Sequence, residues 1–204
     1  YRRNHLLRSK AAGDDWNRLP TPSGFHLSEL WAQGSDVFLY GQSDRPQGGR
    51  LLESTDAGAT WQTKPLPIED LSCSPDVVQL PVIWVQCASG MTAGLWRSTD
   101  GGQTYVNPGK EGASAEPNAA VFAVAANDTV VVGFRDLRRT TDGGVHWHAV
   151  GPKLGRSTEW DYLGFTDARH GVGIRLSNAG PPPTRFGLWQ TSDGGAHWTR
   201  VRIS

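Results

Sequence analysis

An eight-residue segment with one fixed pattern recurs four times along this chain of 204 residues. The pattern is Ser or Thr, any residue, Asp, any residue, Gly, any residue, Thr or His, and finally Trp or Tyr. The four copies lie at Ser54, Asp56, Gly58 and Trp61; at Ser98, Asp100, Gly102 and Tyr105; at Thr140, Asp142, Gly144 and Trp147; and at Thr191, Asp193, Gly195 and Trp198. Repetition at a regular period is typical of an array of small structural units, so the repeat determines the kind of fold to expect.

A fifth, decayed copy lies near the beginning of the sequence. It keeps Ser9, Gly13 and Trp16 but lacks the Asp. The aromatic residues that end the five copies are 45, 44, 42 and 51 residues apart along the chain. A four-stranded blade of a β-propeller takes roughly 40–50 residues. We therefore predict an all-β fold, a β-propeller of four-stranded antiparallel blades with about five repeats.

The needs of a tight turn explain the residues of the repeat. An Asp carboxylate and a Ser or Thr hydroxyl can accept hydrogen bonds from backbone N–H groups across a turn. The Gly supplies a position with positive φ, which a side chain resists. The Trp or Tyr begins the outgoing strand, where its ring can pack between neighbouring blades. We expect these four segments, called the box turns below, to be structural.

The repeat spacing also divides the chain. We predict one propeller domain with four full blades over residues 20–204, preceded by the outer hairpin of a further blade at residues 1–19. Each blade should end with a strand after its box turn, such as residues 105–108. Since exposed sheet edges are a liability, the inner strands of the first blade are expected to precede Tyr1. The first blade is thus expected to be incomplete, and we expect a fragment of a larger ring, a processed chain or an open five-blade arc rather than a self-sufficient ring.

These segments resemble the Asp-box propellers, whose motif is also called the bacterial neuraminidase repeat. The phrase Phe165-Thr-Asp167-Ala-Arg-His170-Gly171-Val-Gly173 is similar to the inner strands of photosystem II assembly-factor-like proteins and related bacterial proteins. The resemblance covers nearly the whole chain and implies the propeller fold. It does not imply one function, because sialidases, xyloglucanases, sortilin-type receptors and assembly factors share the repeat.

The residues favour a non-catalytic binding or assembly module over an enzyme. Sialidases of this group usually carry a Phe/Tyr-Arg-Ile-Pro segment, and here Phe134-Arg135 matches only its first two positions. No phosphate-binding loop and no nucleophile elbow occurs in the sequence. A carbohydrate-binding or glycoside-hydrolysing propeller stays open as the alternative, since such a site needs only two facing carboxylates. Its candidate residues are Glu69, Asp70, Glu159 and Asp161.

Charge and hydropathy narrow the choice of partner. The chain has 20 basic and 20 acidic residues, so no overall field attracts nucleic acid or an anionic membrane. No apolar run approaches the ~20 residues that cross a bilayer. We expect another protein as the partner, with a carbohydrate as the alternative, and neither nucleic acid nor a membrane span.

The loops opposite the box turns are the expected binding surface. Arg, Trp and Tyr contribute most to the binding energy of protein interfaces. The predicted contact patch is therefore Arg45, Arg135, Arg156, Trp160 and Tyr162. Packing of Trp160 and Tyr162 between blades is the alternative.

Cys73 and Cys87 are the two cysteines of the chain, and they fall on neighbouring strands of one predicted hairpin. A cross-strand pair favours a disulfide over two buried thiols. A disulfide would place the protein outside the cytoplasm, in the periplasm, at the cell surface or in the medium. His146 and His197 take the place of a Thr in their box turns, so we expect turn hydrogen bonds from them, no metal site and no cofactor.

Overall fold

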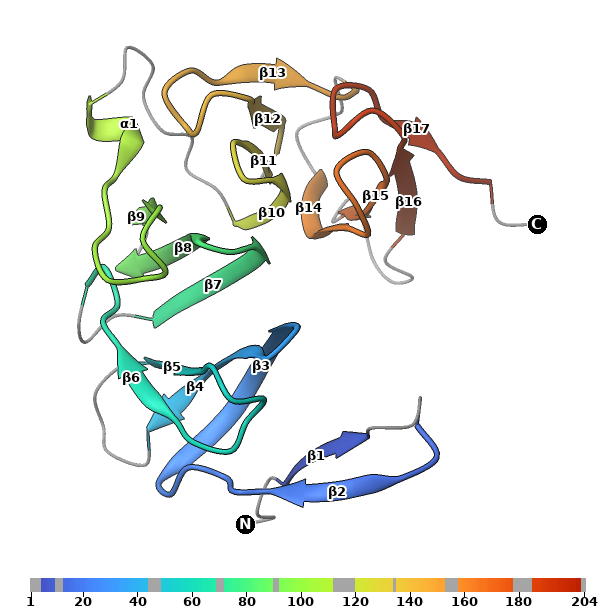
Figure 1. The fold of residues 1–204 in the computed structure, drawn as a ribbon. Coiled ribbons are helices and arrows are strands. Elements are labelled where there is room, and N and C mark those ends of the chain that lie inside the picture. The colour runs from blue at the N-terminus through green and yellow to red at the C-terminus, as the bar shows by residue number, and fades with distance from the viewer. Residues whose placement is uncertain are drawn as a thin grey trace.

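The structure is a computed structural model that describes residues 5–9, 13–43, 49–68, 72–89, 92–111, 120–133, 135–152, 158–177 and 185–202. Its strands form antiparallel sheets, several of them four-stranded, which confirms the predicted all-β class. Figure 1 shows the sheets in chain order around an open arc, with the first strand of each long sheet on the concave side. The arrangement is consistent with the blades of a propeller.

The sheets are built as follows. The first hairpin pairs β1 (Leu6–Ser9) with β2 (Trp16–Leu19). Blade 1 contains β3 (Phe25–Gln33), β4 (Asp36–Ser43), β5 (Gly49–Ser54) and β6 (Gln62–Lys64). Blade 2 contains β7 (Ser72–Gln79), β8 (Val82–Ser89) and β9 (Thr92–Ser98). Blade 3 contains β10 (Val121–Ala126), β11 (Thr129–Gly133), β12 (Leu137–Thr140) and β13 (His148–Val150). Blade 4 contains β14 (Thr158–Phe165), β15 (Gly171–Ser177), β16 (Arg185–Thr191) and β17 (Thr199–Arg200).

Blade 2 departs from the predicted four strands. The strand expected at residues 105–108 is reduced to one bridge, in which Val106 exchanges both backbone hydrogen bonds with Arg97 (2.8 and 2.9 Å). The short helix α1 (Pro108–Glu111) follows it. Proline has no N–H to continue a ladder but fits the first turn of a helix, which explains the change. Within the described part of the chain, no helix has the length and apolar character needed to cross a membrane.

The four box turns share one set of hydrogen bonds. In the third, Thr140 Oγ1 donates to Asp142 Oδ1 (2.8 Å) and accepts a bond from the Gly144 N–H (2.9 Å). Asp142 Oδ1 also accepts from the His146 N–H (3.0 Å). The two hydroxyl bonds recur in the other box turns at Ser54, Ser98 and Thr191. All four hydroxyl-bearing residues are buried, so these bonds are shielded from water.

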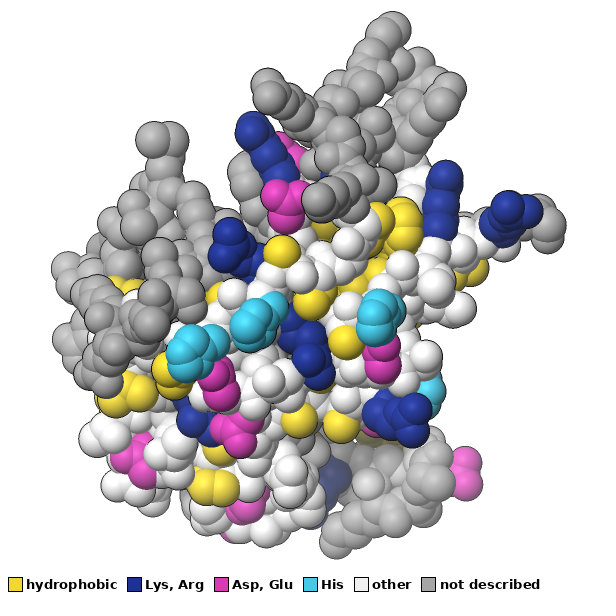
Figure 2. Space-filling model, turned by 90° about the horizontal axis from the view of Figure 1, so that it is seen from above, with side chains coloured by type: hydrophobic (Ala, Val, Ile, Leu, Met, Phe, Trp, Pro, Cys, Tyr) yellow, Lys and Arg dark blue, Asp and Glu magenta, His cyan; other side chains and the backbone are white. Residues whose placement is uncertain are grey.

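The same bonds make the box aspartates unusually acidic. The backbone N–H of His146, helped by its ring, lowers the pKa of Asp142 to about 2, and His197 acts equally on Asp193. In the first two box turns the pKa of the Asp is also well below its ordinary value, chiefly through the hydroxyls of Thr60 and Thr104. On the face drawn in Figure 2, histidine side chains lie beside acidic ones and charges of both signs are interspersed.

A further hydrogen bond, repeated in all four copies, connects each box turn to the inner hairpin of its own blade. The residue after the box Asp has positive φ in all four copies, at Ala57, Gly101, Gly143 and Gly194. Its N–H donates to a carbonyl oxygen in the turn between the first two strands, at Ser35, Pro81, Asp128 and Arg169 respectively (2.8–3.1 Å). The box turn and the turn of the inner hairpin therefore lie at the same end of each blade.

In four of the five repeats, a leucine three residues before the Ser or Thr forms the contact with the next sheet. Leu6, Leu51, Leu95 and Leu137 are buried, and each belongs to an apolar cluster that also contains residues of the next blade. The box aromatic of that next blade joins the cluster: Trp61, Tyr105, Trp147 and Trp198 respectively. The apolar core is thus divided into layers between the sheets.

Arginines before the repeats add polar links between neighbours. Arg8 Nη1 donates to the carbonyl oxygen of Ala57 in the next box turn (2.9 Å), and Arg139 Nε donates to that of Gly194 (2.7 Å). Arg97 forms an ion pair with Asp128 of the next blade. Each link joins a sheet to the turn region of its successor, alongside the leucine contact.

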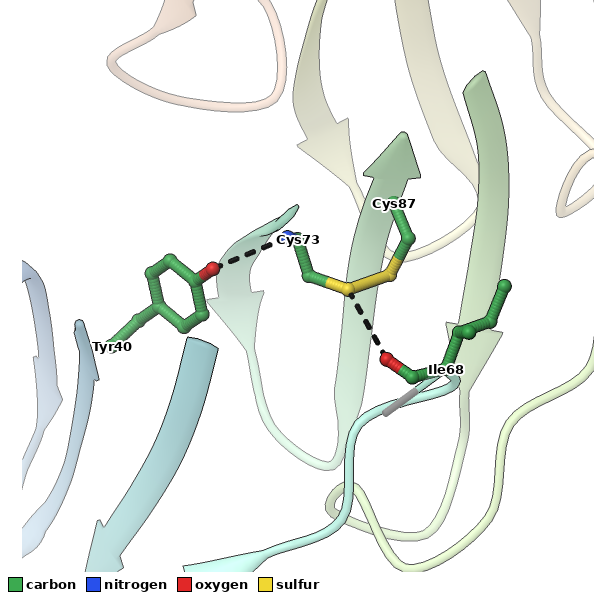
Figure 3. Close-up of a disulfide and its surroundings, with 4 residues drawn as sticks. All are labelled: Tyr40, Ile68, Cys73 and Cys87. Carbon is green, nitrogen blue, oxygen red and sulfur yellow. Dashed lines mark hydrogen bonds between the residues drawn. A yellow bond between two sulfur atoms is a disulfide. The ribbon is translucent and has the colours of Figure 1, made fainter. Parts of the chain in front are cut away.

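The predicted disulfide is confirmed. Cys73 in β7 and Cys87 in β8 are directly paired in register, with Cα atoms 4.0 Å apart, and their sulfurs are bonded. Figure 3 shows Tyr40 of blade 1 reaching this hairpin, where its Oη accepts a hydrogen bond from the Cys73 N–H (3.2 Å). The bridge therefore lies in the apolar layer between blades 1 and 2.

The buried box hydroxyl can be tested with an isosteric change. Thr140→Val leaves the Gly144 N–H without its acceptor, so we expect the free energy of unfolding to fall by about 1–3 kcal/mol. The control is Thr141→Val, an exposed position in the same turn, which should stay close to the parent. Urea unfolding followed by tryptophan fluorescence measures both. Equal stability of the two variants would contradict a structural role for the hydroxyl.

The disulfide closes a loop with a sequence separation of 14. Restriction of the unfolded chain by such a loop corresponds to about 3 kcal/mol. We expect the double variant Cys73→Ala/Cys87→Ala to lose about this much, and peptide mapping of the non-reduced parent to show the linked pair. Parent unfolded in reductant is the control and should match the double variant. Unchanged stability in both would show that the bridge does not stabilise the fold.

Candidate functional site

The first strand of every blade carries an irregularity on the concave side of the arc (Figure 1). The strand register shifts in β3 between Leu27 and Glu29, in β7 between Asp76 and Gln79, in β10 between Val124 and Ala126, and in β14 between Trp160 and Tyr162. Such bulges free a backbone group and redirect side chains, and they are common next to active sites. The concave strands therefore present polar groups that regular strands would not.

Two acidic residues link three of these strands. Glu29 of β3 accepts a hydrogen bond from the Ser74 hydroxyl of β7 (3.4 Å). Asp76 of β7 accepts one from the N–H of Val124 at the bulge of β10 (3.0 Å). With Tyr40, these residues form what we call the Glu29 cluster: Glu29, Tyr40, Ser74 and Asp76. It lies where blades 1 and 2 meet at the concave side.

Burial makes the Glu29 carboxyl group weakly acidic. Desolvation raises the pKa of Glu29, the charge of Asp76 adds to the rise, and the Ser74 hydroxyl opposes it. Desolvation also raises the pKa of Tyr40, and Glu29 contributes. A carboxyl that keeps its proton to a higher pH, beside a second carboxylate, is what general-acid catalysis needs. Asp76 by contrast has a structural task, because it satisfies the N–H exposed by the β10 bulge.

Neither Glu29 nor Asp76 was among the carboxylates predicted from the sequence. Of the predicted ones, Glu159 and Asp161 lie on β14, with Glu159 half-buried and Asp161 exposed. Glu69 and Asp70 lie outside the described residues. A usable signal was present for Glu29, because it stands next to Leu30 and Trp31 in the middle of a first strand. An acidic residue at such a position is unexpected unless it has a partner. Among the described residues, no group of His, Cys, Asp and Glu could hold a metal ion.

Three residues of the predicted contact patch lie in the described part of the chain. Arg135 is exposed, and Tyr162 is 49% exposed. Trp160 is only 2% exposed and packs between blades 3 and 4, which was the alternative to a place in the contact patch. Its ring centroid lies 5.7 Å from that of Trp198 and 6.2 Å from that of Trp189. Arg45 and Arg156 lie outside the described residues.

The bulge in β14 explains why Trp160 and Tyr162 have different surroundings. In a regular strand, residues two apart share a face. The extra residue at Asp161 shifts the alternation, so Trp160 and Leu163 both face blade 3 while Tyr162 faces the other way. Sequence spacing alone would have placed both aromatic rings on one side.

Arg175 is a buried cation that sequence reasoning missed. It lies on β15, is 4% exposed, and its guanidinium carbon is 5.7 Å from the ring centroid of Trp160. Burial lowers the pKa of Arg175, and the charge of Asp136 from blade 3 opposes this. The cation–π contact and the nearby carboxylate partly compensate for burying the charge. Arg175 therefore lies on the side of β15 that faces Trp160 and connects blades 3 and 4.

Comparison with curated proteins gives sequence relatives that are named as xyloglucanases. A xyloglucanase of Paenibacillus sp is 29% identical over 230 residues, which cover 92% of this chain and 22% of that protein. A xyloglucanase of Acetivibrio thermocellus is 30% identical over 151 residues, covering 55% of this chain and 17% of its own length. This chain thus spans about a fifth of the length of these curated relatives. No family model matches the sequence.

Solved structures share the fold at low identity. The structure of YCF48 bound to D1 peptide covers 96% of this chain and 75% of its own, with 15% identity and a TM-score of 0.53. The Hadza microbial sialidase Hz136 covers 98% of this chain and 43% of its own, with 13% identity and a TM-score of 0.50. These neighbours share the fold that the resemblance of the repeats implies.

The expectation that this chain is not an enzyme is overturned by the sequence relatives. Both are named as xyloglucanases, and one alignment runs through 92% of the chain. A missing Phe/Tyr-Arg-Ile-Pro segment excludes the sialidase pattern alone, because other glycoside hydrolases of the same fold need only two suitably placed carboxylates.

The raised pKa of Glu29 predicts how stability depends on pH. In the unfolded chain a Glu ionises near 4.5, and in the folded protein at a higher pH. The free energy of unfolding should therefore fall as pH rises through this interval and stay lower above it. Glu29→Gln cannot ionise, so we expect it to be more stable than the parent at pH 7 and equal to it at pH 3.

Glu53→Gln is the control for this experiment, because Glu53 forms an ion pair with Lys64 (3.0 Å) on the outer strands. It should show no gain at pH 7. Urea unfolding at both pH values measures the difference. A Glu29→Gln variant that is less stable than the parent at pH 7 would mean that the ionised carboxylate is well solvated or paired.

Proposed function

We propose that this chain forms consecutive blades of an Asp-box β-propeller in an exported glycoside hydrolase of the xyloglucanase type. The observation that carries the proposal is the alignment with a xyloglucanase through 92% of the chain. The proposed blades are the four sheets from residue 20 onward, with the outer hairpin of a further blade at residues 1–19. The chain corresponds to about a fifth of the length of these relatives. We therefore propose that it supplies part of the surface that contacts the glucan.

The concave side of the arc supports this role chemically. Hydrolysis of a glycosidic bond needs one carboxylic acid that donates a proton to the leaving oxygen and a second carboxylate across the sugar. Glu29 has the raised pKa of a proton donor. Asp161 is exposed on another concave strand and is our candidate for the second group, which would take a proton from the attacking water. We assign these two roles as part of the proposal.

Location outside the cytoplasm belongs to the same proposal. The Cys73–Cys87 disulfide supports it, because such bonds persist in oxidising compartments. A secreted or surface location also fits an insoluble or very large glucan substrate, which cannot enter a cell.

Binding of a protein chain is the second candidate function. The observation that favours it is the same fold in YCF48 bound to D1 peptide, which covers 96% of this chain. Arg135 and Tyr162, both exposed, are the described residues that would make the contact, and Arg45 and Arg156 complete the predicted patch.

The first function is tested with soluble xyloglucan. We expect the chain to bind it in isothermal titration and to release reducing ends, and Glu29→Gln to keep the binding while the rate of release falls by about 10²–10⁴-fold. The control Glu53→Gln, far from the concave side, should keep both properties. Absence of binding to xyloglucan, together with saturable binding of a protein ligand that Arg135→Ala weakens, would decide for the second function.

A further inference from the structure

Two consecutive residues of β7 hold the Glu29 cluster from the side of blade 2. The N–H of Cys73 donates to Tyr40 Oη (3.2 Å), and the hydroxyl of the next residue, Ser74, donates to a carboxylate oxygen of Glu29 (3.4 Å). Tyr40 lies on β4 and Glu29 on β3, so both bonds cross from blade 2 to blade 1. The position of this short piece of β7 therefore decides whether the two bonds form.

Backbone pairing with β8 holds this piece of β7 only in part. The Cys73 N–H points to Tyr40, and the Cα atoms of Cys73 and Cys87 are 4.0 Å apart. This separation is closer to the about 4.5 Å of a non-hydrogen-bonded pair than to the about 5.5 Å of a hydrogen-bonded one. Pro75 has no N–H, and the register shifts after Asp76. At Cys73 the disulfide, rather than a backbone hydrogen bond, joins the two strands.

The bridge itself has little freedom to move. Cys73 and Cys87 are 3% and 1% exposed, and they share one apolar cluster with Tyr40 and Leu51 of blade 1. Figure 3 shows the bridge directly behind the Tyr40 contact. Because protein interiors are close-packed, a covalent link in this layer can shift only together with its surroundings. The residue that follows Cys73 in β7 is therefore fixed relative to blade 1.

We propose that the Cys73–Cys87 disulfide is a positioning element for Glu29, which fixes β7 so that the Ser74 hydroxyl meets the Glu29 carboxylate. The positioning does not depend on the proposed function. Its consequence for hydrolysis of a glucan rests on that function, in which Glu29 is the proton donor.

The bridge has a defined effect on the acidity of Glu29. Burial is the main cause of the raised pKa of Glu29, and the Ser74 hydroxyl opposes the rise. The titratable groups beside Glu29 are Asp76 of β7, whose charge adds to the rise, and Tyr40 of β4. By keeping Ser74 in place, the bridge limits how weakly acidic the carboxyl group becomes.

The test follows the ionisation of Glu29 by carbon-13 NMR of its carboxyl group, which is assigned from the signal that Glu29→Gln lacks. Ser74→Ala removes a hydrogen bond to the charged form, so the pKa of Glu29 should rise. The bridge-free variant Cys73→Ala/Cys87→Ala should raise it by the same amount. Combining the bridge-free variant with Ser74→Ala should add nothing, because both changes act through one hydrogen bond.

Thr140→Val is the matched control, because it should destabilise the protein from blade 3 without touching the Glu29 cluster. It should leave the pKa of Glu29 as in the parent. Circular dichroism checks that every variant is folded, and trimethylamine oxide is added to all samples if one is not.

Three outcomes would overturn the proposal. The first is a pKa of Glu29 that falls or stays unchanged when the bridge is removed, since water entering an opened hairpin would lower it. The second is a rise that adds to that of Ser74→Ala. The third is a bridge-free chain that stays unfolded in trimethylamine oxide, because the bridge would then serve the fold and not the position of Glu29.

The pH profile of reducing-end release from xyloglucan connects the bridge to the proposed function. Its alkaline limb reports the ionisation of the proton donor, so it should move to higher pH in Ser74→Ala and in the bridge-free variant alike. A limb that moves in Ser74→Ala alone would contradict the inference. If the parent releases no reducing ends, the proposed function fails, and the NMR measurement still decides whether the bridge positions Glu29.

Discussion

The hydrogen bond from a hydroxyl to a carboxylate two residues later holds each box turn in one shape, and the remaining structure depends on that shape. It orients the Asp to accept backbone N–H groups and brings the following aromatic residue to the sheet before it. The next residue's N–H joins the turn to the inner hairpin of the same blade. One small polar unit thus sets both the closure of a blade and its packing on a neighbour.

The concave side follows another constraint. A bulge in each first strand interrupts its pairing with the second strand of the same blade and leaves backbone groups that need partners. Asp76 supplies one such partner, while Glu29 is left in partly desolvated surroundings with a weakly acidic carboxyl. The hydrogen bond of Asp76 stabilises the fold, whereas the partly desolvated carboxyl group of Glu29 destabilises it at neutral pH. Groups that are costly to folding are often those retained for chemistry.

The sequence predicted what depends on neighbours along the chain, and less of what depends on neighbours in space. The box turns, the sheet order and the Cys73–Cys87 bridge follow from spacing and strand alternation. The bulge at Asp161 could not be read from alternation, since one extra residue reverses the side on which Tyr162 lies. The surroundings of Arg175 and Glu29 come from other blades, so neither burial nor pKa was visible. The short helix at Pro108 could have been anticipated, because proline cannot extend an outer strand.

The division of the core into layers between blades has a consequence for how this protein unfolds. Among the described residues, each apolar cluster joins one sheet to the next, so free energy passes along the array from one neighbour to the next, as in a one-dimensional cooperative chain. Loss of a central layer would divide the array into two shorter pieces, each with a newly exposed apolar surface. A blade with sheets packed on both of its faces should therefore open to hydrogen exchange less often than a sheet with one covered face.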